Sequence, residues 1–150
     1  KTLIGQLWAL GVLAEVGLFL VMHRLLHRWG ARKVLIASLL LAALRWLMIG
    51  YLPDSLARLL IAQLLHAATF GTFHAAAIHL VHLYFRGRLQ GRGQALYSSV
   101  SFGAGGAIGA LGSGFAWDAL GPELTYALAS AVAVLGAVVA WYYIDSAHDH

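Results

Sequence analysis

The chain has 150 residues, of which 61% are hydrophobic and only 11% charged, with a formal net charge of +4 and no cysteine. Soluble domains contain about 25% charged residues, so this composition argues against a soluble globular domain. The absence of cysteine excludes disulfides and thiolate metal sites. The basic residues lie in short clusters between apolar runs, which favours loops at a membrane surface over a nucleic-acid interface.

Five apolar segments follow one another along the chain, at about 3–22, 34–52, 56–85, 95–117 and 123–144. A helix needs about 20 apolar residues to cross the hydrocarbon of a bilayer. All five segments reach or approach that length, and the third exceeds it. The sequence therefore predicts an all-α, polytopic membrane helix bundle with five transmembrane helices, the third of which tilts or extends past the membrane.

The breaks between the segments alternate in charge. The two segments His23–Lys33 and Arg86–Gln94 are basic, whereas Leu52–Ser55 and Asp118–Glu123 carry only acidic charge. Cytoplasmic loops of membrane proteins are enriched in Lys and Arg. We therefore expect both basic segments and the C-terminus to face the cytoplasm.

Two charged residues interrupt the first two apolar segments. Glu15 lies in "GVLAEVGLF" and Arg45 lies in "LAALRWLMIG". A charge near the centre of a membrane helix costs about 2.5–3.5 kcal/mol on insertion scales. The two helices are antiparallel neighbours, and the long arginine side chain can bridge the difference in depth. We expect an ion pair or a shared polar cavity, and a purely structural pair is the alternative.

The third segment, "IAQLLHAATFGTFHAAAIHLVHLYF", carries polar and aromatic residues at helical spacing. Gln63, His66, Phe70 and His74 recur at intervals that place them on one helix face. Histidine titrates near neutral pH, which suits a proton-coupled step. Amide, imidazole and aromatic side chains also suit an organic substrate with a polar group. The alternative is that these histidines are satisfied by a neighbouring helix.

The fourth segment contains six glycines between Ser101 and Trp117. Small residues allow membrane helices to approach closely, and Gly105 and Gly109 form a small-xxx-small pair. We expect them to pack against another helix, or to let this helix slide during a transport cycle. Polar residues near the start of the segment line a pathway or bond across helices: Tyr97, Ser98, Ser99 and Ser101.

The stretch "HRLLHRWGARKVL" resembles the basic loop that follows the second helix of each half in the major facilitator superfamily. Arg28, Gly30, Arg32 and Lys33 match the tail of that motif, and His27 stands where the family has an aspartate. The stretches "WALGVLAEV", "ALRW" and "QLLHAATFGTFHAAAIHLV" are similar to the branch of phenylpropionate permeases and nucleoside–proton symporters.

This resemblance implies that the five helices correspond to helices 8–12 of a twelve-helix transporter. Residues 1–150 would then be a partial C-terminal half that lacks its first helix and the whole N-terminal half. In related sugar–proton symporters, an acid, an arginine and a histidine on three successive helices couple protons to substrate. Glu15, Arg45 and His66 are similar to them in kind and order. The resemblance also implies the bacterial inner membrane.

We therefore predict a secondary transporter, a proton symporter for an aromatic acid, a nucleoside or a sugar. Its partners would be that solute, a proton, the lipid bilayer and the missing half, with no nucleic acid, cofactor, metal or catalytic residue. One alternative is a small membrane protein or scaffold without transport activity. Another is a membrane metalloenzyme, because His23/His27 and His74/His79 superficially resemble spaced histidine boxes.

Overall fold

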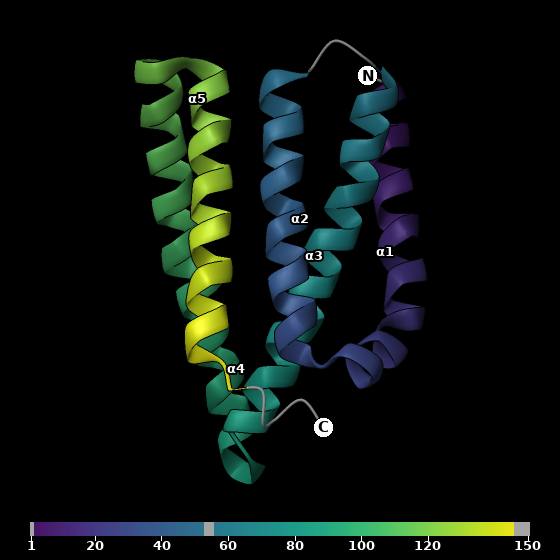
Figure 1. Ribbon diagram of the computed structural model, residues 1–150, viewed down its shortest axis with the longest axis vertical. Helices are drawn as coiled ribbons and strands as arrows, with labels where there is room; N and C mark the ends of the chain where they lie inside the picture. Colours follow the sequence, from purple (N-terminus) through teal and green to yellow (C-terminus); the bar gives the residue numbers. More distant parts are fainter. Residues whose placement is uncertain (1, 53–55, 146–150) are drawn as a thin grey trace.

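A computed structural model of the chain (Figure 1) describes residues 2–52 and 56–145, and all secondary structure within these ranges is helical. The elements in order are α1 (Thr2–Trp29), α2 (Ala31–Tyr51), α3 (Leu56–Tyr84), the 3₁₀-helix η1 (Gly87–Leu89), α4 (Gln90–Ser98), the π-helix η2 (Ser99–Ala104) and α5 (Gly105–Tyr143). The predicted all-α bundle is confirmed. Three stretches of the described residues are long and apolar enough to cross a membrane: Ala31–Tyr51, Leu60–Tyr84 and Gly87–Tyr143.

The element α5 consists of two helical arms that lie side by side (Figure 1). The chain reverses at Gly121, whose φ of 81° and ψ of 174° interrupt the helix. Glycine adopts positive φ at no steric cost, and Pro122 is suited to the first position of the helix that follows. The predicted break Asp118–Glu123 is therefore shorter in the structure, where only Gly121 departs from helical φ and ψ. We call 105–120 the first arm and 122–143 the second arm.

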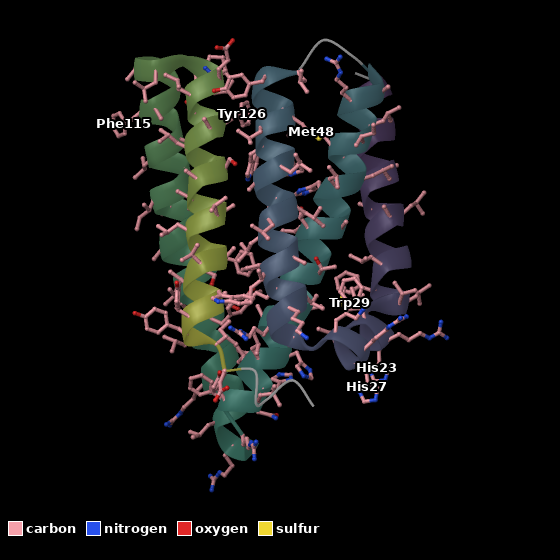
Figure 2. All side chains as sticks on the ribbon, in the orientation of Figure 1. His23, His27, Trp29, Met48, Phe115 and Tyr126 are labelled. Atoms are coloured by element: carbon pink, nitrogen blue, oxygen red, sulfur yellow. The ribbon has the colours of Figure 1, made fainter. Side chains whose placement is uncertain are left out.

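The prediction that His23–Lys33 forms a loop is wrong. The helix α1 continues to Trp29, and the only interruption before α2 is Gly30, with φ of 80°. No residue between His23 and Trp29 breaks a helix, and Leu25 and Leu26 pack against the core. The basic side chains therefore extend from the end of a helix. Figure 2 shows His23 and His27 at this end, directed away from the bundle.

The helix α2 lies at the centre of the bundle, between α3 and the second arm of α5, while α1 packs against α3 (Figure 1). The core is built from small and medium apolar side chains: Met22, Ala31, Val34, Leu35, Ala76, Ala77, Leu80 and Ala140. Close approach depends on glycine at several contacts, among them those of Gly50 with Tyr126 and of Gly71 with Leu18. The first contact joins α2 to α5, and the second joins α3 to α1.

The first arm of α5 has a different environment, because nearly all of its side chains are exposed. Phe115 is 75% exposed and points away from the other helices (Figure 2). A Cβ atom added to Gly109 would meet no atom within 4 Å, and one added to Gly105 would meet only Val100 O, in the adjoining η2. Packing of Gly105 and Gly109 against another helix therefore remains a prediction.

Two predicted features fall outside the described part of the chain. Residues 53–55, which make up most of the predicted acidic break Leu52–Ser55, are not described, and neither is the side chain of Glu15. The basic segment His23–Lys33 spans the α1–α2 junction, and Arg86–Gln94 leads into α4. Both lie at the end of the bundle opposite the turn at Gly121 (Figure 1).

Gly50→Ala should destabilise the complete protein. The added Cβ would lie 2.8 Å from the Cβ of Tyr126, an atom fixed close to the backbone of α5. Overpacking of this kind costs about 1–3 kcal/mol, which thermal unfolding in detergent would register as a lower Tm. Gly17→Ala is the matched control, because no atom lies within 4 Å of the added group and alanine favours the helix. Equal Tm values for the two variants would contradict the packing of α2 against α5.

Candidate functional site

The guanidinium of Arg45 is buried at the interface of α2 with α3, and Arg45 is only 8% exposed. Its NH1 group donates a hydrogen bond of 2.9 Å to Nδ1 of His66, and its Cζ atom lies 4.1 Å from the centre of the Trp46 ring. The Nε atom is buried and has no hydrogen-bond partner among the described residues. Among the described side chains, the hydrogen-bond and stacking partners of this cation are an imidazole and an indole, neither of which carries a negative charge.

The hydrogen bond between Arg45 and His66 fixes the state of the imidazole. A guanidinium nitrogen can only donate, so Nδ1 of His66 must accept. The imidazole in this arrangement is therefore neutral, with its proton on Nε2. A proton added to Nδ1 would remove the acceptor and place a second positive charge beside Arg45.

Phe70 lies between two histidines on α3. Its ring stacks on His66, with centroids 5.7 Å apart and an interplanar angle of 26°. It also stacks on His74, with centroids 6.3 Å apart and an angle of 5°. The sequence spacing of four residues brings successive rings together on one helix face. Phe70 is 46% exposed, so this face remains open beside the stack.

His74 connects α3 to the helical segment that follows. Its Nδ1 atom lies 3.3 Å from the hydroxyl of Tyr97 in α4, within hydrogen-bond distance. Phe102, in the π-helix η2, contacts both rings, with centroids 5.8 Å from His74 and 5.8 Å from Tyr97. We call this continuous set of contacts the polar–aromatic row, made of Arg45, His66, Phe70, His74, Tyr97 and Phe102.

The structure brings together four of the six predicted substrate- and proton-binding residues: Arg45, His66, Phe70 and His74. Gln63 lies instead against α1, with its amide over Gly11. The ion pair of Arg45 with Glu15 remains a prediction, since the side chain of Glu15 is not described. The sequence pattern marks Tyr97 only as one of several polar residues near the start of the fourth segment and does not mark Phe102, because neither residue has a periodic relation to α3.

The residues of the basic motif have separate surroundings. Arg32 donates a hydrogen bond through NH2 to the backbone oxygen of Trp141, and its Cζ lies 4.8 Å from the centre of that indole. It therefore fastens the start of α2 to the end of α5. Gly30 provides the helix break, while Arg28 and Lys33 are exposed.

Comparison with known proteins agrees with this architecture. The profile of the MFS_1 like family matches residues 1–128 of the chain. The chain belongs to the MFS_1 like family. It is therefore an integral membrane protein of the major facilitator type, as the sequence motifs predicted.

A curated relative gives a more specific likeness. Over 126 residues the chain is 35% identical to an Escherichia coli (strain K12) protein described as "Probable 3-phenylpropionic acid transporter". The match covers 84% of this chain and 33% of the relative, so the chain spans about a third of the length of that protein. No solved structure matches the chain significantly.

The hydrogen bond between Arg45 and His66 should contribute measurably to stability. His66→Phe keeps a ring but leaves a buried guanidinium donor without its acceptor, at a cost of about 1.5–3 kcal/mol. We expect the Tm of the complete protein to fall, and His66→Gln, whose amide oxygen can accept the same bond, to restore most of the loss. His79→Phe, at an exposed position on α3, is the control. If His66→Phe and His66→Gln unfold at the same temperature, the hydrogen bond does not stabilise the fold.

Proposed function

We propose that this chain is part of a secondary transporter, rather than an enzyme, and that its solute is a small aromatic acid. The observation that carries the proposal is the buried cation of Arg45, whose partners among the described side chains are an imidazole and an indole rather than a carboxylate. A charged side chain inside a membrane usually pairs with an opposite charge and marks a transport pathway. A guanidinium matches a carboxylate in geometry and can bind it through two parallel hydrogen bonds.

The rest of the row supports an aromatic group next to that carboxylate. Phe70 is partly exposed beside His66, and aromatic rings attract one another in stacked or edge-to-face arrangements. The description of the Escherichia coli relative names an acid with a phenyl ring, which has both features. Nucleosides and sugars, the other predicted solutes, generally carry no carboxylate for Arg45.

We further propose that a proton enters with the acid and binds His66 or Glu15. A carboxylate at Arg45 and a proton on His66 attract each other, so each raises the affinity of the site for the other by the same factor. Protonation of Nδ1 would also end the hydrogen bond to Arg45 and release the guanidinium for the solute. Binding would thus be coupled without a metal or a cofactor.

The transport cycle we propose is alternating access, in which two halves of the transporter rock about a site near the middle of the membrane. In this arrangement the row would face the other half, and Gly105 and Gly109 would pack against it. Both basic segments lie at one end of the bundle, which supports a cytoplasmic location for that end and for the C-terminus. We propose the bacterial inner membrane as the location.

Arg45→Gln should abolish most uptake of radiolabelled 3-phenylpropionate by the complete protein in proteoliposomes. Losing the charged hydrogen bonds to the carboxylate should weaken apparent affinity about 10- to 100-fold. Arg45→Lys keeps the charge without the planar fork and should give an intermediate value. Arg58→Gln, at an exposed position on α3, should transport normally. Unchanged affinity in Arg45→Gln would remove Arg45 from the substrate site.

Accumulation by the wild-type protein should collapse when an uncoupler dissipates the proton gradient. His66→Gln keeps an acceptor for Arg45 but cannot carry a proton. It should therefore still exchange labelled for unlabelled acid while failing to concentrate it against a gradient. Accumulation that persists with the uncoupler would eliminate proton symport, and accumulation by His66→Gln would assign the proton to another residue, with Glu15→Gln as the next variant.

A further inference from the structure

We propose that His74 and Tyr97 form a second polar contact of the substrate site, which selects aromatic acids with a hydroxyl group on the ring end opposite the acid arm. This inference rests on the proposed function, because it extends the site that begins at Arg45. It concerns a pair of residues in α3 and α4 that no part of the proposed proton cycle uses.

The order of groups along the row motivates the proposal. A charged and hydrogen-bonding pair, Arg45 and His66, stands at one end, followed by the ring of Phe70 and then by the hydrogen-bonding pair of His74 and Tyr97. His66 and His74 are eight residues apart, which is about 12 Å along a helix. A hydroxylated aromatic acid has the matching order of carboxylate, ring and hydroxyl.

The chemistry of the second pair suits a phenolic hydroxyl. Neutral imidazole and phenol can each donate and accept a hydrogen bond, and so can the hydroxyl of the solute. The 3.3 Å separation between Nδ1 of His74 and the Tyr97 oxygen is longer than most hydrogen bonds to oxygen. A solute hydroxyl can therefore form hydrogen bonds with one or both groups, and only the weak contact between His74 and Tyr97 is lost.

The π-helix η2 provides independent support, because it brings a third ring to this pair. Residues five apart, such as Tyr97 and Phe102, lie about 140° apart around a regular α-helix. The wider turn of a π-helix brings such residues nearer to one another, and π-bulges occur frequently at functional sites. Here the two rings meet edge to face at 82° and both contact His74. Phe102 is nevertheless 50% exposed, so the cluster is open on one side.

The test compares two solutes in the same assay. Uptake of 3-phenylpropionate and of 3-(4-hydroxyphenyl)propionate is measured with the complete protein in proteoliposomes, for the wild type, Tyr97→Phe and His74→Phe. Both substitutions keep a ring for stacking and remove the polar atoms. Tyr142→Phe, at an exposed position near the end of α5, is the matched control.

We expect the wild type to prefer the hydroxylated acid in kcat/KM, and Tyr97→Phe to reduce that preference about 3- to 10-fold, because kcat/KM should fall more for the hydroxylated acid than for the unsubstituted acid. Thermal unfolding of each variant shows whether it is folded. Equal transport of both acids by the wild type, or an equal loss for both acids in Tyr97→Phe, would overturn the selectivity proposal while leaving aromatic-acid transport intact. Failure of the wild type to transport either acid would instead refute the proposed function, and this inference with it.

Discussion

The buried guanidinium of Arg45 is the constraint on which the arrangement of this chain depends. A positive charge inside an apolar bundle is tolerated only where neighbouring groups replace water. Trp46 covers one face of the guanidinium and His66 accepts from NH1. These partners lie on two helices, so α2 and α3 must pack at a fixed depth and rotation. The face of α3 that carries His66 then also carries Phe70 and His74, and the row follows from that one orientation.

Small residues make this packing possible, and the two arms of α5 use them differently. The second arm approaches α2 at Gly50, and the indole of its Trp141 lies beside Arg32 at the opposite end of α2. The first arm carries more glycine but leaves it uncovered by the described residues. Glycine is costly in an exposed soluble helix but lets membrane helices approach closely. An uncovered glycine face is therefore consistent with a helix that meets a surface beyond this chain.

Sequence patterns predicted the helices well because lipid imposes a length on each apolar run. The end of α1 was predicted less well, because basic charge was interpreted as a loop although only Gly30 can break the helix there. Within the site, His66, Phe70 and His74 could be predicted since they share one helical period. Tyr97 and Phe102 could not, because their contacts with His74 depend on how α4 folds back and on the π-turn in η2. Neither property leaves a periodic signal in one sequence.

In the proposed cycle, charge balance favours an acid over the other solutes that the sequence left open. Binding of a monocarboxylate together with one proton leaves the net charge of the site unchanged. The membrane potential, worth about 2.3 kcal/mol per charge per 100 mV, would then do no work on net solute transfer, and the pH difference across the membrane would drive accumulation. With a neutral sugar or nucleoside, a proton on His66 would lie beside the guanidinium without a solute anion to offset its charge, across the contact of 2.9 Å that the hydrogen bond now occupies. In the proposed cycle, the same contact that orders the bundle would thus make proton binding at His66 depend on an anionic solute.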